Sequence, residues 1–166
     1  HTEFLKKAYG LYFSENALNP GAFPSLRKFE AEVVSMVADL FHGGAHAAGT
    51  RTSGGTESIL MAVKTYRDRA RALRPGIEAP EMILPISAHP AFEKAAHYFD
   101  VKPVHVPLGP DFRVDVAAAR KAVTPDTILI VGSAPAYPQG VMDPIEELAA
   151  LAREADLGMH VDACVG

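Results

Sequence analysis

The amino-acid sequence predicts an α/β fold in which a mostly parallel sheet is flanked by helices. Short apolar runs alternate with segments of helical periodicity through the second half of the chain, and the connections between them are short. The run from Thr127 to Gly132 is apolar and rich in β-branched residues, as expected of a strand buried on both faces. Such alternation is typical of βαβ units, whose strands lie parallel to one another.

Two helices are expected before this alternating region. The first spans Glu3 to Ser14, and a loop rich in Asn, Pro and Gly follows it. The second spans about Ser25 to Phe41 and ends at Gly43-Gly44. Its apolar residues recur at helical spacing and are expected to form a buried stripe: Leu26, Phe29, Val33, Met36, Val37 and Leu40. We therefore predict an N-terminal helical segment over residues 1–44 and a larger domain over residues 45–166.

The larger domain is expected to begin with a small-residue run, Ala45 to Gly49, that can enter as a strand and leads into a long helix ending near Leu73. Asp115 and Asp143 are the predicted N-caps of two later helices, and Asp143 is followed by Pro and then by Glu in the pattern of a helix start. The remaining elements are expected as strands at 82–85, 103–106, 127–132 and 158–162, and as a helix at 90–98.

Composition excludes several classes of function. The chain has 166 residues and a net charge of −4, without a cluster of Lys and Arg, so no nucleic-acid partner is expected. Cys164 is the single cysteine, which excludes an internal disulfide and favours a reducing, cytoplasmic location. No apolar run is long enough to cross a bilayer. The chain starts with His1 and stops after a strand-like run, so we expect a piece of a longer protein.

The turn Ser53-Gly54-Gly55-Thr56 stands where the long helix begins, and it predicts a phosphate-binding site. The first N–H groups of a helix have no partner within the helix, and the helix dipole favours negative charge there. Two glycines leave the backbone open to an anion, and the Ser and Thr hydroxyls add donors. The alternative is an ordinary Ser cap on a Gly-rich turn.

Three further polar residues fall at the ends of predicted strands, where ligands bind in open α/β sheets: His89, Ser133 and Asp162. Each also has a purely structural interpretation, as does Cys164, which is expected more as a small hydrophobic residue than as a nucleophile. His42 and His46 have the spacing of metal ligands, but Gly43-Gly44 breaks any helix between them, so no metal site is expected.

Together the turn, the imidazole and the carboxylate suit pyridoxal 5′-phosphate. The turn would hold the phosphate, His89 would stack on the ring, and Asp162 would keep the pyridine nitrogen protonated. A protonated ring withdraws electrons from a breaking bond at the α-carbon of an amine substrate.

These motifs resemble those of the sphingosine-1-phosphate lyase family, within the group II pyridoxal-phosphate decarboxylases. The resemblance covers nearly the whole chain and rests on Asn16 and five segments: Phe23–Val33, Gly49–Ala62, Pro80–Ile83, Ser87–Ala95 and His160–Gly166. It implies that the chain is the first part of the large domain of a fold-type I pyridoxal-phosphate enzyme.

The resemblance also implies roles for individual residues. Ser53, Gly54, Gly55 and Thr56 would hold the phosphate, with Ser133 and Cys164 lining the cofactor pocket, and Asn16 would reach the substrate region. His89 and Asp162 are the implied catalytic residues. The family's Schiff-base lysine follows the Asp-Ala motif by some tens of residues, and the sequence stops before that position, so the chain is expected to be inactive alone. A homodimer with the site at the subunit interface is implied as well.

The expected reaction is retro-aldol cleavage of a phosphorylated long-chain base, such as sphingosine 1-phosphate, to a fatty aldehyde and phosphoethanolamine. An amino-acid decarboxylase on the same fold is the alternative. A third interpretation, from another class, is a non-catalytic binding or dimerisation fragment.

Overall fold

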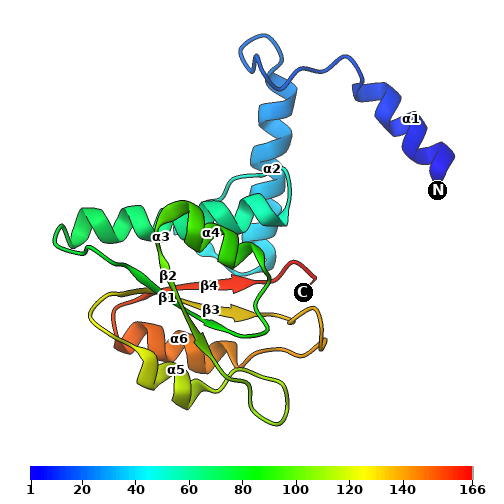
Figure 1. Cartoon of the computed structure of the whole chain (residues 1–166). Helices are drawn as coiled ribbons and strands as arrows, with labels where there is room; N and C mark the ends of the chain where they lie inside the picture. The colour runs from blue at the N-terminus through cyan, green and yellow to red at the C-terminus, as the bar shows by residue number, and fades with distance from the viewer. Residues whose placement is uncertain (166) are drawn as a thin grey trace. The chain divides into compact units, whose positions relative to one another are not determined.

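The computed structural model describes residues 1–165, which form two compact units (Figure 1). The first unit covers His1–Thr52, and the second begins at Ser53 and continues to the end of the described chain. The division into domains at residues 44 and 45 stays a prediction. No helix among the described residues is long and apolar enough to cross a membrane.

The first unit contains the two helices that the sequence predicts, α1 (Thr2–Tyr12) and α2 (Pro24–Leu40). The expected burial of the α2 stripe is wrong for this chain, because neither helix contains a buried residue. Met36 and Leu40, for example, are 66% and 73% exposed. Helical periodicity identifies which face is apolar, but it does not say what covers that face.

The predicted strand at Ala45–Gly49 is also wrong. A short 3₁₀ helix, η1 (Gly44–His46), occupies its beginning, and the chain then runs to Thr52 without pairing to another strand. Ala and Gly are poor strand formers because they offer little side-chain surface for packing on a pleated sheet. The turn at Ser53 to Thr56 therefore does not follow a strand, contrary to expectation.

The second unit contains a four-stranded sheet whose neighbouring strands are all parallel, in the order β2-β1-β3-β4. This confirms the predicted fold class. The strands are β1 (Glu81–Pro85), β2 (Lys102–Val106), β3 (Thr127–Ser133) and β4 (Gly158–Asp162). Every residue of the two central strands, β1 and β3, is buried, which explains why they read as continuous apolar runs.

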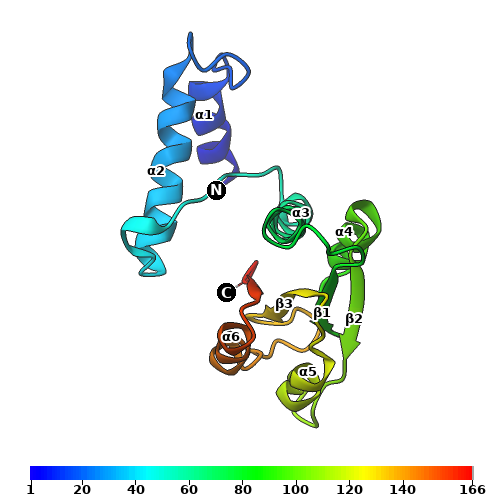
Figure 2. The ribbon, with the colours of Figure 1, turned by 90° about the vertical axis from the view of Figure 1, so that its left-hand side faces the viewer.

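Two helices cover each face of the sheet, as Figure 2 shows end-on. On one face lie α3 (Gly55–Leu73) and α4 (Ala91–Phe99), which enclose a core that includes Val63 and Phe92. On the other face lie α5 (Val116–Ala122) and α6 (Ile145–Glu154), around Ile130 and Leu148. The sandwich holds the carboxyl ends of the strands in a fixed arrangement.

Tyr66 ties α3 to the strand that carries Asp162. Its ring lies over Gly158, where an added Cβ would be only 2.2 Å from Tyr66 Cε1, and its hydroxyl donates to the Met159 carbonyl at 2.6 Å. Since α3 begins at the predicted phosphate-binding turn, this contact fixes that turn relative to β4.

Candidate active site at the carboxyl edge of the sheet

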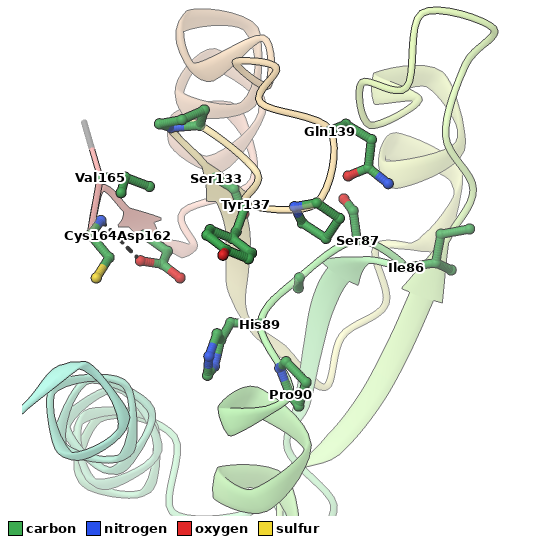
Figure 3. Close-up of a pocket in the computed structure, with 13 residues that line it drawn as sticks. Ile86, Ser87, His89, Pro90, Ser133, Tyr137, Gln139, Asp162, Cys164 and Val165 are labelled. Atoms are coloured by element: carbon green, nitrogen blue, oxygen red, sulfur yellow. Dashed lines mark hydrogen bonds between the residues drawn. The ribbon is translucent and has the colours of Figure 1, made fainter.

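A cavity of about 650 Å³ opens at the carboxyl ends of β1, β3 and β4 (Figure 3). Four of the predicted site residues line it, namely His89, Ser133, Asp162 and Cys164. The remaining lining residues are Ile86, Ser87, Ala88, Pro90, Pro135, Tyr137, Pro138, Gln139 and Val165. The topology explains this position. From β1 the chain continues to one side, to β2, whereas from β3 it continues to the other, to β4, and ligands bind in open α/β sheets where the chain direction reverses.

The predicted phosphate-binding turn is exposed at the start of α3. Gly54 is the N-cap without a side-chain cap bond, so the simple Ser-cap alternative is wrong. Instead, the Ser53 N–H donates to Glu57 Oε2 at 2.6 Å. The Ser53 side chain and then this backbone bond lower the pKa of Glu57. Glu57 thus holds the backbone of Ser53 in place directly before the helix.

Glycine geometry shows room for an anion at this turn. An added Cβ at Gly54 would meet nothing within 4 Å, and one at Gly55 would meet only Cys164 Sγ, at 3.8 Å. The helix start therefore faces the end of the chain that carries Cys164 and Asp162. Predicted phosphate binding by Ser53 to Thr56 fits this open backbone, and it stays a prediction.

His89 follows β1 and precedes α4. Its Nδ1 accepts the Ala91 N–H at 3.1 Å, which orients the ring from the first turn of the helix. Because Nδ1 acts as an acceptor, the ring proton of the neutral form is on Nε2. In Figure 3 the imidazole projects into the space between the α3 side and the β4 side of the cavity. A ring held in this way can stack on a planar ligand.

Asp162 ends β4 beside Ser133, its register partner on β3. The Ala134 N–H donates to the Asp162 carbonyl at 2.8 Å, and Oδ1 accepts the Cys164 N–H at 3.2 Å. Among residues 1–165, the carboxylate oxygen Oδ2 accepts no protein hydrogen bond, so it is available to a ligand. The half-buried carboxylate is therefore oriented by its own turn and directed into the cavity (Figure 3).

His160 lies two residues before Asp162 and so faces the same side of the sheet. Its ring makes an edge contact with Phe92 of α4, with the ring centroids 5.7 Å apart. Burial lowers the pKa of His160, and the negative charge of Asp162 opposes this shift more weakly. His160, which lies two residues before Asp162 on the same strand, is therefore neutral at pH 7.

Asp143 is a residue whose role the sequence analysis misread. It is 3% exposed and caps no helix, since the N-cap of α6 is Pro144. Its Oδ1 accepts the Val114 N–H at 2.9 Å and its Oδ2 accepts the Ser133 N–H at 2.8 Å. The carboxylate thus anchors the end of β3, where Ser133 lines the cavity. The other predicted cap, Asp115, is confirmed, because it accepts the Ala118 N–H at 2.9 Å.

The loop after β3 supplies cavity residues that the sequence analysis missed. A cis peptide joins Ala134 to Pro135, and the loop closes through a bridge between Ala136 and Val141. Between the cis peptide and the bridge, the loop places Tyr137 and Gln139 in the cavity lining. Tyr137 is 83% exposed. The sequence did carry a signal for this loop, because Pro135, Pro138 and Gly140 follow the apolar strand β3. Asn16 lies in the first unit, and its substrate contact stays a prediction.

The arrangement fits pyridoxal phosphate chemically. An open helix N-terminus suits a phosphate, a half-buried carboxylate suits a protonated ring nitrogen, and an oriented imidazole suits the ring face. No Lys or Arg of the described chain lines the cavity. Residues 10–166 match the model of the pyridoxal-dependent decarboxylase conserved domain. The chain belongs to the pyridoxal-dependent decarboxylase family.

Individual relatives in the pyridoxal-dependent decarboxylase family sharpen this result. The mouse protein named sphingosine-1-phosphate lyase 1 is 52% identical over 99% of this chain, which covers 29% of that protein. A solved structure of sphingosine-1-phosphate lyase from Burkholderia pseudomallei is 47% identical, with a TM-score of 0.93 over all of this chain and 40% of that one. These matches confirm the resemblance inferred from the motifs, and the family confirms the expected cofactor.

A decarboxylase also shares the fold. The glutamate decarboxylase of Lactobacillus brevis is 26% identical, with a TM-score of 0.79 over 92% of this chain and 38% of that chain. The chain spans about three tenths of the length of the curated relatives it matches.

Proposed function

We propose that the protein containing this chain cleaves a phosphorylated long-chain amino alcohol, such as sphingosine 1-phosphate, to a fatty aldehyde and phosphoethanolamine. The observation that supports this most strongly is the 52% identity to the mouse lyase over almost the whole chain, against 26% for the glutamate decarboxylase. The substrate amine and the carbon-carbon bond to be broken would lie in the cavity at the carboxyl edge of the sheet.

Two groups of residues would hold the cofactor. The backbone N–H groups at Gly55 and Thr56, with the Ser53 and Thr56 hydroxyls, would bind its phosphate at the start of α3, which is not part of the cavity lining. In the cavity, Asp162 Oδ2 would hold a proton on the ring nitrogen, and the His89 ring, whose Nδ1 accepts the Ala91 N–H, would stack on the cofactor ring. Bound pyridoxal phosphate supplies an electron sink for bond cleavage at the α-carbon of an amine. Ser133 and Cys164 shape the walls around it.

This chain supplies only part of the site. We propose that the lysine that binds the cofactor covalently is contributed by sequence outside these residues, and that the chain alone does not turn over. The proposed site also includes Asn16 of the first unit as a substrate contact.

Assembly and location complete the proposal. We propose a homodimer with the site at the subunit interface, supported by the exposed apolar residues of α2, which include Val33, Met36 and Leu40. Burying such a stripe against a partner would remove apolar surface from water. A cytoplasmic location is proposed from the single free cysteine.

An amino-acid decarboxylase is the second candidate, supported by the shared fold of the glutamate decarboxylase. Product analysis separates the two. The full-length protein, loaded with cofactor, is incubated with sphinganine 1-phosphate, glutamate or aromatic amino acids. We expect aldehyde from the phosphorylated base and no carbon dioxide from the amino acids. Carbon dioxide without aldehyde would overturn the lyase proposal in favour of the decarboxylase.

A further inference from the structure

The hydroxyl group of Ser87 stands out in the cavity because it is buried and unpaired. Its oxygen is shielded from solvent and makes no hydrogen bond, and no other side-chain nitrogen or oxygen of the described residues shares that state. Native proteins pair almost all buried polar groups, so an unpaired one points to a functional partner or an ordered water. Ser87 lines the cavity, so a ligand bound there is a candidate partner for its oxygen.

Gln139 is a polar residue that lines the same cavity as Ser87. Figure 3 shows the Ser87 hydroxyl directed toward the Gln139 side chain, at the edge of the cavity away from Asp162 and Cys164. Ile86, an apolar lining residue, lies on the same side of the cavity in Figure 3. A hydroxyl and a carboxamide both donate and accept hydrogen bonds, and neither carries charge.

The charge of the cavity determines which group this edge can bind. Asp162 is negative, and none of the described lining residues is a Lys or Arg that could neutralise a second anion. A substrate carboxylate placed between Ser87 and Gln139 could accept a hydrogen bond from each, but its charge would have no cationic partner among the described lining residues. A substrate hydroxyl can donate to one residue and accept from the other, and it brings no charge that needs a partner.

We propose that Ser87 and Gln139 form a neutral subsite that binds a hydroxyl group of the substrate and thereby favours amino alcohols over amino acids. This inference rests on the proposed lyase function. It also gives the unpaired Ser87 oxygen a partner in the substrate-bound state. The hydroxyl concerned is the one on carbon 3, next to the bond that the proposed reaction breaks.

Two ligands that lack the amine test the subsite without turnover. They are the 1-phosphate of a long-chain 1,3-diol and the 1-phosphate of the matching long-chain alcohol, which differ by the carbon-3 hydroxyl alone. Their dissociation constants are measured by calorimetry on the full-length, cofactor-loaded protein. The unmodified protein should bind the diol phosphate about 5-fold more tightly, as expected for one net hydrogen bond.

The variants Ser87→Ala and Gln139→Leu should each bind the two ligands within about 2-fold of each other. Thr65→Ala is the matched control, because it removes a hydroxyl from the exposed surface of α3 and should keep the preference. Equal binding by the unmodified protein would overturn the subsite while leaving the lyase function intact. A Ser87→Ala protein that keeps the preference, or that loses cofactor affinity instead, would overturn it too. If neither phosphate binds, the proposed function fails and the subsite fails with it.

Discussion

The substitution Gly55→Ala separates phosphate binding from folding at the start of α3. The added Cβ would lie 3.8 Å from Cys164 Sγ, an ordinary van der Waals contact, so the fold accommodates it. Alanine also favours helix over glycine, so the free energy of unfolding should stay level or rise by up to about 1 kcal/mol. The same methyl group occupies the space through which a phosphate would approach the backbone.

The loss in cofactor affinity follows from the bonds that the methyl group blocks. A hydrogen bond to a charged group contributes about 1.5–3 kcal/mol, so losing one weakens binding roughly 10- to 150-fold. The assay is a fluorescence titration of the apo full-length protein with pyridoxal phosphate, together with its thermal melting without the cofactor. Gly76→Ala is the control, since an added Cβ there meets nothing within 4 Å and the residue does not line the cavity.

The prediction is specific because Gly55→Ala should change cofactor affinity and apo stability in different ways. Affinity should fall while apo stability does not, and Gly76→Ala should change neither by much. Unchanged affinity in a folded Gly55→Ala protein would refute phosphate binding at this turn.

Three further substitutions test other parts of the account. Asp162→Asn keeps the size of the side chain but removes its charge, so turnover should fall at least about 100-fold while cofactor content, measured by absorbance, changes little; full turnover would contradict the role of Asp162. Asp143→Ala leaves the Val114 and Ser133 amides without acceptors, which should cost about 2–5 kcal/mol and expose both amides in hydrogen exchange; continued protection would count against the anchor. Burial lowers the pKa of His160 in the folded state, so its stabilising contribution is complete above the unfolded value of about 6.5 and is lost as pH falls below it. Melting temperatures between pH 5 and 8 should therefore drop less on acidification in His160→Phe, and parallel profiles would exclude His160 as a source of this dependence.

The fold could be predicted from the sequence because its signals are local. The central strands are buried on both faces and so appear as continuous apolar runs, and the Asp115 cap bonds a residue only three positions away. Where these strands and this cap lie in the sequence therefore depends little on the rest of the chain.

Asp143 shows where local patterns mislead. The sequence Asp-Pro-Ile-Glu has the form of a helix start, but its carboxylate bonds backbone groups 10 and 29 residues away. Because these partners come together only in the folded chain, a nearby cap was the simpler interpretation.

The helix α2 shows a second limit. Its periodicity correctly gives a helix with one apolar face, whereas burial depends on a partner surface that the described first unit does not supply.

The candidate site was partly predictable for the same reason. His89, Ser133 and Asp162 were identified because each lies at or just after the end of a strand, and in a parallel sheet the carboxyl ends of the strands share one edge. Tyr137 and Gln139 were missed because the closed loop after β3 brings them back over the cavity, and only three-dimensional contacts reveal that path.

We expect one cofactor molecule to extend from the start of α3 to Asp162 in the cavity. A structure of the full-length protein with pyridoxal phosphate bound tests it most directly. The phosphate should lie within hydrogen-bonding distance of the Gly55 and Thr56 N–H groups, the ring should lie against His89, and the pyridine nitrogen should face the Asp162 carboxylate. A cofactor phosphate bound away from the start of α3, or a ring nitrogen that does not face Asp162, would contradict it.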